Sequence, residues 1–298
     1  MSKIINTAIE LENFSVIFNE NKKQNILLKD LNYKFEKGKI HYIIGPSGAG
    51  KTVLISHFNG LMTSKYGKIK IFDKLIKTSK RGKVKNVKQI RKQVGLVFQF
   101  AEYQLFKTTI ENDIIFGPLN FKVKKEEAKK RAKKYLNSVG LNETFLQRNP
   151  FELSGGQKRR VAISGILAIE PEILIFDEPT AGLDPQGEKE MMEIMKNIRA
   201  LGKTVIVVTH SINQAMEISD NVVVIGNQKI LKDGDIYDIF NDKKLVESMN
   251  LSVPHIYQIV DMLIVKDKKY KKLLELKPKT IEQLANDINF LKGKHETK

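Results

Sequence analysis

A glycine-rich stretch near residue 50 has the residue types that bind phosphate. In order, it consists of Gly45, Pro46, Ser47, Gly48, Ala49, Gly50, Lys51 and Thr52. The glycines let successive backbone N–H groups turn inward around phosphate oxygens, and the expected helix after them adds its positive end. Lys51 is placed to reach β- and γ-phosphates, and Thr52 to ligate Mg²⁺. The alternative is a plain glycine loop, but so complete a pattern arises by chance in roughly one chain in a hundred.

Two carboxylates follow an apolar run further along the chain. Residues 173–176 read Ile-Leu-Ile-Phe, and Asp177 and Glu178 come directly after them. Taken alone, such a run is more often a strand that ends at the surface. After a phosphate-binding loop, however, Asp177 is suited to hold Mg²⁺ through water, and Glu178 to polarise the water that attacks the γ-phosphate. The two motifs together predict a nucleotide hydrolase that uses Mg²⁺, but they do not define which kind.

A third motif lies shortly before these carboxylates. After Leu153 it continues with Ser154, Gly155, Gly156 and Gln157. Alone it could be only a serine that caps a helix. At this position it resembles the signature motif of the ABC ATPase superfamily. That resemblance implies that a helix N-terminus offers Ser154 and the glycine N–H groups to the γ-phosphate of ATP bound on the opposite subunit, so that the protein works as a dimer.

Further positions match the same superfamily. Gln99 follows the apolar run 94–98 and resembles the Q-loop glutamine, which senses Mg²⁺ and the attacking water. Asp184 belongs to a stretch, residues 181–184, that resembles the D-loop at the dimer interface. His210 ends the run 204–209 and resembles the switch histidine that contacts the γ-phosphate. The resemblance therefore implies catalytic roles for Glu178, His210 and Gln99.

Aromatic and histidine residues outside these motifs give weaker expectations. Phe18 stands where the family usually has a tyrosine that stacks on adenine, and a phenylalanine keeps the aromatic face without the hydroxyl. His41 lies within an expected strand and His57 on an expected helix, so both are interpreted as structural.

One part of the sequence indicates a particular group within the ABC superfamily. Residues 97–106, with 115–118, closely resemble the ATPase subunits of energy-coupling factor (ECF) transporters, which import vitamins and transition-metal ions; Ala101 stands where those proteins usually have proline. The order Glu102-Tyr103-Gln104 resembles the second of the two ATPase subunits, and residues 252–256 resemble the family's C-terminal region.

This resemblance implies several partners. They are a second, different ATPase subunit, a transmembrane coupling subunit and a membrane subunit that binds the substrate. It also implies a peripheral position on the cytoplasmic face of the cell membrane. Glu102 is the candidate acceptor for an arginine of the transmembrane subunit, and an ordinary solvated carboxylate is the alternative.

The elements that must position these residues follow from hydropathy. Apolar, β-branched runs suit strands buried on both faces of a mostly parallel sheet, and they cover residues 40–44, 94–98, 173–176, 204–209 and 221–225. Helical patterns cover residues 124–139, 154–168 and 186–200. This alternation predicts an α/β fold.

The family resemblance makes this fold more specific. It implies an ABC-type P-loop ATPase core in residues 1–237, with a β-subdomain and a helical signature subdomain at about 102–170. The helical, charged pattern of residues 238–298 predicts a small C-terminal α-helical domain, and the resemblance to the ECF family implies that this domain serves dimerisation.

The amino-acid composition excludes some kinds of site and of protein. The absence of cysteine excludes disulfides and thiolate metal sites, and no run approaches the 18–20 apolar residues of a membrane span. We expect a soluble protein of the cytoplasm. The net charge of +17 is mostly scattered lysine, typical of a solvated surface, and the dense basic stretch 74–92 has the same interpretation, with a phospholipid headgroup contact as its alternative. The charge leaves open a soluble ABC ATPase that acts on nucleic acid, although no nucleic acid is expected. A nucleotide switch that does not hydrolyse ATP is the third possibility.

Overall fold

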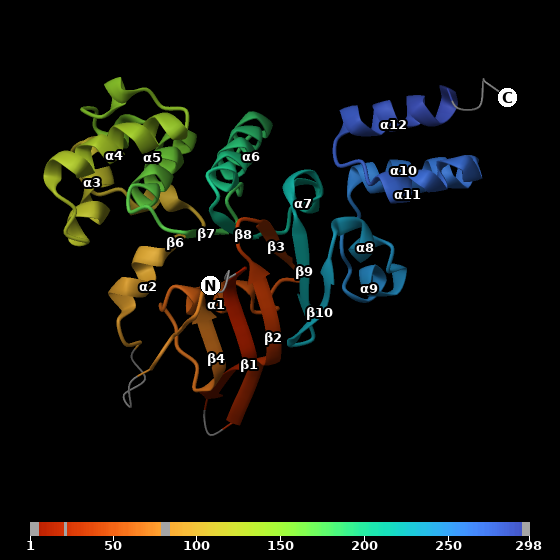
Figure 1. Cartoon of the computed structure of the whole chain (residues 1–298), viewed down its shortest axis with the longest axis horizontal. Helices are drawn as coiled ribbons and strands as arrows, with labels where there is room; N and C mark the ends of the chain where they lie inside the picture. Colours follow the sequence, from red (N-terminus) through yellow and green to blue (C-terminus); the bar gives the residue numbers. More distant parts are fainter. Residues whose placement is uncertain (1–5, 21–22, 79–83, 294–298) are drawn as a thin grey trace, which may run out of the picture.

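A parallel sheet forms the centre of the molecule (Figure 1). The computed structural model describes residues 6–20, 23–78 and 84–293 of the chain. Six strands pair in the order β10-β9-β3-β8-β7-β6, and all neighbours are parallel except β10 and β9. The strands are β3 (Ile40–Ile44), β6 (Val94–Val97), β7 (Ile173–Asp177), β8 (Thr204–Val208), β9 (Asn221–Gly226) and β10 (Lys229–Gly234). The five predicted strands are thus confirmed to within one residue at each end.

Each face of this sheet has its own hydrophobic core because successive side chains point to opposite faces. Ile40, Tyr42 and Ile44 pack on one face with helices, whereas Ile43 packs on the other with α1 (Lys51–Phe58) and a second sheet. Burial on both faces explains why the parallel strands are continuous apolar runs.

The second sheet is antiparallel and lies at the bottom of Figure 1. Its strand order is β2-β1-β4-β5, and β1 and β2 pair over most of their length. The strands are β1 (Thr7–Glu20), β2 (Lys23–Glu36), β4 (Tyr66–Ile71) and β5 (Lys74–Leu75). This sheet corresponds to the predicted β-subdomain.

Helices of the central part surround the parallel sheet. The group α3–α5, drawn at the upper left of Figure 1, packs together, and the signature motif forms the start of α5. The helices are α2 (Val87–Gln93), α3 (Ile110–Asn120), α4 (Lys125–Ser138), α5 (Gly155–Leu167), α6 (Pro185–Ala200) and α7 (Ile212–Ile218), with short 3₁₀ turns η1 (Ala101–Gln104), η2 (Glu143–Phe145) and η3 (Pro150–Glu152). All three predicted helices are confirmed, and each lies within one residue of its expected ends.

The C-terminal part is helical, as predicted, and has a small core of its own, formed by Val260, Tyr270, Leu273, Leu284 and Leu291. Its elements are α8 (Ile236–Phe240), α9 (Lys243–Ser248), α10 (His255–Lys266), η4 (Lys268–Lys272), α11 (Leu273–Leu276) and α12 (Ile281–Gly293). Helix α8 spans the boundary predicted between residues 237 and 238, so the division into two domains stays a prediction.

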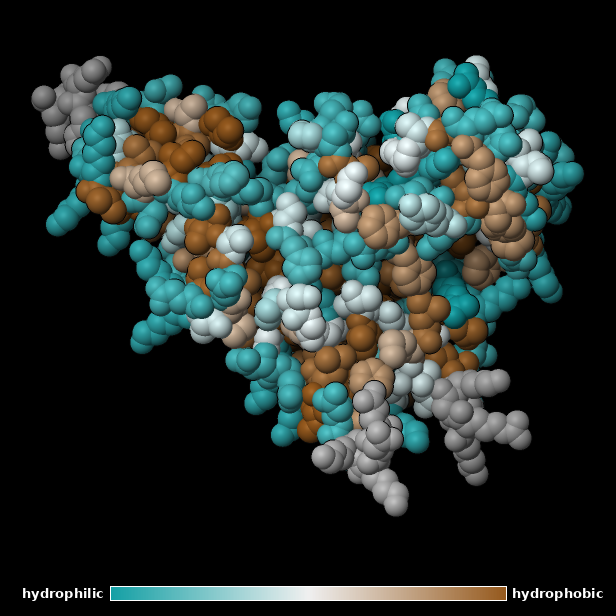
Figure 2. All heavy atoms as spheres, turned by 180° about the vertical axis from the view of Figure 1, so that it is seen from behind, coloured by the Kyte–Doolittle hydropathy of each residue, from teal (hydrophilic) through white to brown (hydrophobic). Residues whose placement is uncertain are grey.

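These C-terminal helices expose apolar side chains. Val265 is 86% exposed, Ile281 70% and Met262 69%. Figure 2 shows apolar atoms gathered over the C-terminal helices, at the left of that view. Within the described part of the chain, none of the helices combines the length and the hydropathy needed to cross a membrane.

Candidate active site

The glycine-rich loop joins β3 to α1 and packs tightly against the sheet. Gly45 has a φ of 148°, and a Cβ added there would lie 2.0 Å from the carbonyl oxygen of Ile225. Only glycine fits this backbone conformation and this close approach. The loop is therefore held directly at the end of β9.

Lys51 is nearly buried and binds its own loop. Its Nζ donates to the carbonyl oxygens of Gly45 at 2.8 Å and Pro46 at 2.9 Å. Burial lowers the pKa of Lys51, although the charges of Glu178 and Asp177 act in the opposite direction. The ammonium is thus fixed over the loop, where phosphate oxygens would meet it.

The two residues expected to hold Mg²⁺ meet each other. Thr52 Oγ1 donates to Asp177 Oδ1 at 3.2 Å. Burial raises the pKa of Asp177, and the charge of Glu178 adds to that rise while the Thr52 hydrogen bond opposes it. A hydroxyl, a carboxylate and the amide oxygen of nearby Gln99 are the hard oxygen donors that Mg²⁺ takes, usually beside substrate phosphates.

Glu178 and His210 form a second pair. His210 Nε2 lies 3.2 Å from Glu178 Oε1, and the His210 backbone N–H donates to Glu178 Oε2 at 3.3 Å. Glu178 has a φ of 49°, a left-handed conformation that is strained for a glutamate, while its own N–H donates to Val208 at 2.8 Å. The strain and these bonds fix the carboxylate at the end of β7.

These groups surround one hollow of about 580 Å³. The structure thus brings together nine of the predicted residues around it. They are Ser47, Gly48, Ala49, Gly50, Lys51, Thr52, Gln99, Glu178 and His210. Asp177 joins them through Thr52.

Two hydrophobic residues differ in their relation to this hollow. Leu27 also lines it, and no chemical signal in the sequence pointed to this leucine. Phe18 is half-buried, packs against the core between the two sheets and is not among the lining residues, so its stacking on adenine stays a prediction.

The signature motif lies apart from this hollow. Ser154 caps α5, because its Oγ accepts the Gln157 N–H at 3.3 Å while Gln157 Oε1 accepts the Ser154 N–H at 3.1 Å. Ser154 is exposed, and a Cβ added at Gly155 or Gly156 would meet no atom within 4 Å. The motif therefore presents a capped helix start to open space.

The remaining predicted residues lie as follows. Asp184 is exposed and begins α6, since its Oδ1 accepts the Gly187 N–H at 2.7 Å. His41 and His57 are buried and hydrogen-bond the carbonyls of Glu36 and Val53 at 2.9 and 2.7 Å, which confirms their structural interpretation.

Glu102 differs from its expectation. Both of its carboxylate oxygens are bound by Arg159 of the same chain, at 2.9 and 2.8 Å. It is therefore neither an open acceptor for a partner's arginine nor a solvated carboxylate, and no local pattern in the sequence pointed to this pairing. The two residues are 57 positions apart.

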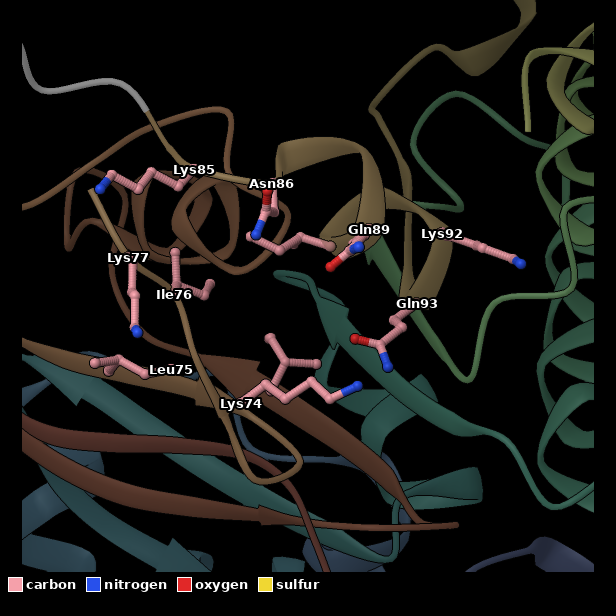
Figure 3. A pocket seen from close by; sticks show the side chains of 11 residues that line it. Lys74, Leu75, Ile76, Lys77, Lys85, Asn86, Gln89, Lys92 and Gln93 are labelled. Atoms are coloured by element: carbon pink, nitrogen blue, oxygen red, sulfur yellow. The ribbon is translucent and has the colours of Figure 1, made fainter. Parts of the chain in front are cut away.

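The basic stretch 74–92 lines a separate hollow of about 550 Å³ (Figure 3). Figure 3 shows the ammonium groups of Lys74, Lys77, Lys85 and Lys92 spread apart around it. All four lysines are exposed, and no ion pair joins them to a described carboxylate. They fit the interpretation of a solvated surface. Residues 79–83 of this stretch lie outside the described residues.

Comparisons with known proteins agree with this geometry. A family model described as "ABC transporter" matches residues 28–181. The energy-coupling factor transporter ATP-binding protein EcfA2 of Mycoplasma pneumoniae is 47% identical over 282 residues, which cover 94% of this chain and 93% of that protein.

Solved structures show the same likeness. The structure of cbiO1 from Clostridium perfringens, part of the ABC transporter complex cbiONQ, is 33% identical with a TM-score of 0.71 and covers 86% of this chain and 99% of its own. A dimeric post-hydrolysis state of the ATP-binding cassette MJ0796 with ADP and Pi is 29% identical with a TM-score of 0.66, and covers 76% and 98%. The chain therefore belongs to the ABC transporter ATPases and, within them, to the ATP-binding subunits of energy-coupling factor transporters.

Proposed function

We propose that this ATPase binds MgATP in the hollow beside the glycine-rich loop and hydrolyses it there when a second ATPase subunit closes the site. The observation that carries the proposal is the convergence of Lys51, Thr52, Asp177, Glu178 and His210 around one hollow. The loop N–H groups and Lys51 neutralise the phosphates, since backbone donors and an ammonium suit their charge.

Glu178 and His210 act on the reaction itself. Glu178 accepts a proton from the attacking water, and its fixed carboxylate sets the direction of attack. His210 holds that carboxylate and reaches the γ-phosphate. Thr52, Asp177 and Gln99 would hold Mg²⁺, which neutralises charge on the phosphate oxygens when bound.

The signature motif serves a partner's nucleotide. Ser154, Gly155, Gly156 and Gln157 lie outside this chain's hollow and face open space, so they suit the γ-phosphate of ATP held by a second subunit. Asp184 lies beside that interface. The similar ATP-binding cassette MJ0796 forms a dimer in its structure with ADP and Pi, which supports a dimer here.

The partner is a different ATPase subunit, held in part by the C-terminal helices. Exposed Met262 and Val265 support this, because they line one hollow and apolar side chains grouped at a surface mark protein interfaces. Ile281 is exposed at a second hollow of these helices.

Membrane subunits contact the segment that follows Gln99. Two aromatic pairs are exposed there: Phe100 with Tyr103, and Phe106 with Phe116, whose ring centroids are 5.0 Å apart. Exposed aromatic rings are typical of interface centres. The subunit thus sits peripherally on the cytoplasmic face of the membrane and drives import of vitamins or transition-metal ions, selected by a membrane partner.

A detergent pull-down of the tagged full-length chain from its own cells tests this proposal. A second ABC ATPase and a polytopic membrane protein, identified by mass, are the expected partners. A Tyr103→Asp, Phe106→Asp variant should lose the membrane protein and keep the ATPase. A Met262→Asp, Val265→Asp variant should weaken the ATPase contact. Recovery of nucleic acid without a membrane protein would contradict the proposal.

A further inference from the structure

Arg159 is a buried arginine on the helix that follows the signature motif. It lies in α5, five positions after Ser154, and is 4% exposed. Its guanidinium makes four hydrogen bonds within the chain. Nε and Nη2 donate to the two carboxylate oxygens of Glu102 at 2.9 and 2.8 Å, and Nη1 donates to the carbonyls of Pro179 and Ala181 at 2.9 and 3.0 Å.

These partners belong to two other parts of the site. Glu102 lies in η1, the turn that comes directly after Gln99. Pro179 follows Glu178 directly, and Ala181 is the first residue of the stretch that resembles the D-loop. One planar group therefore joins the start of α5, the segment after Gln99 and the segment after Glu178. Only the fixed fork of an arginine reaches all these acceptors at once.

The three segments also touch beyond Arg159. A Cβ added at Gly182 would lie 4.0 Å from the Phe100 ring, and Ala101, the first residue of η1, is fully buried. Burial of Glu102 raises its pKa, but the hydrogen bonds and charge of Arg159 hold it below the ordinary value. Removing one partner of a buried ion pair leaves the other charge uncompensated, so the pair resists separation.

We propose that Arg159 is a positioning residue for ATP hydrolysis, which couples the segment after Gln99 to the signature helix and the D-loop so that the three move as one body. The inference rests on the proposed function, because it assumes that these segments act on nucleotide and on a membrane partner. A movement at the aromatic pairs near Glu102 is then passed directly to Ser154 and Asp184.

Arg131 offers a matched control. It is a partly buried arginine which, like Arg159, binds carboxylates, those of Glu127 and Glu170, and a backbone carbonyl, that of Ala168. All of its partners lie in α4 or at the end of α5, away from the nucleotide hollow. Substitution of Arg131 therefore removes a comparable set of arginine hydrogen bonds, but leaves the segments after Gln99 and Glu178 unchanged.

The test compares Arg159→Gln, Arg159→Lys, Glu102→Gln and Arg131→Gln in the full-length chain with the subunits that co-purify with it. Arg159→Gln should lower kcat for MgATP by about tenfold or more, because misplaced catalytic groups react slowly. The Kd for ATP should stay within about twofold, since the glycine-rich loop is intact. Arg159→Lys should not restore kcat, because one ammonium cannot bridge the same acceptors. Arg131→Gln should keep kcat.

A double-mutant cycle gives the second measurement. Glu102→Gln should lower kcat less than Arg159→Gln, and should add little when both changes are combined, because coupled residues are not additive. Thermal unfolding of every variant shows which of them fold. The inference is overturned if folded Arg159→Lys and Glu102→Gln retain wild-type kcat, or if Arg131→Gln loses as much as Arg159→Gln. A wild-type complex that hydrolyses no ATP would instead overturn the proposed function.

Discussion

The glycine-rich loop and the signature motif are both helix starts with glycines, yet the structure treats them in opposite ways. At the loop, Gly45 is crowded by Ile225 and Lys51 binds two carbonyls of its own loop. At the signature motif, Gly155 and Gly156 have free space beside them. The same composition thus gives one site that is packed at Gly45 and Lys51, although Gly48 between them is also open, and one site that is open at both glycines. The difference fits the proposal that the first motif holds nucleotide within the chain, whereas the second motif meets the nucleotide of a partner that closes both sites.

Of the changes that test this contrast, Glu178→Gln should have the largest effect, which is on kcat. Glutamine keeps the shape but cannot accept the proton, so kcat should fall by at least about 100-fold. ATP binding should persist, and the closed dimer, in which a packed site meets an open one, should accumulate. Turnover assays and light scattering in MgATP measure both effects. Substantial hydrolysis by the variant would mean that Glu178 is not the base.

Gly45→Ala should destabilise the packed site strongly. The added methyl would collide with a backbone carbonyl that cannot move aside, in a conformation that suits glycine. We expect a loss of about 3 kcal/mol or more in the free energy of unfolding. Urea unfolding without nucleotide measures it. An unchanged midpoint would show that the loop is looser than the structure indicates.

Gly156→Ala is the matched change at the open site. Alanine favours a helix over glycine, so the free energy of unfolding should rise by roughly 0.5–1 kcal/mol at this exposed helix start. The methyl would nevertheless occupy the space intended for the partner's phosphate, and kcat of the assembled ATPases should fall by about tenfold. A variant that is more stable and equally active would contradict the proposal that the signature motif meets the partner's phosphate.

Acid should lower the free energy of unfolding of the part of the molecule around the glycine-rich loop, by less than the substitutions above. Burial lowers the pKa of His41 and His57 below 6.5, because protonation would bury a charge. Below that value the unfolded chain binds more protons than the folded one, so stability falls as pH decreases through 6.5 and levels off below the folded-state pKa. Residues 102–170 contain no histidine. Unfolding between pH 7.5 and 5.5 measures the slope, which His57→Asn should reduce.

Sequence reasoning reached most of the site because its motifs are local. The strands and helices around Lys51, Asp177 and Ser154 follow from short apolar runs and capping residues. It missed Arg159 with Glu102, since nothing local links positions 57 apart. Nor could it find the strained φ of Glu178, which depends on how β7 meets β8. The contact of Leu27 with the hollow arises only when β2 packs beside the loop.

The hydrogen bonds of Lys51 have a consequence for how energy is used. Because the ammonium already holds two carbonyls of its loop, the loop has a defined shape before any nucleotide arrives. Binding then loses little conformational entropy, as in other preorganised receptors. Most of the interaction energy between ATP and the two subunits is left for closing them. A loop that ordered itself only around phosphate would spend that energy on its own folding and transmit less of it as motion.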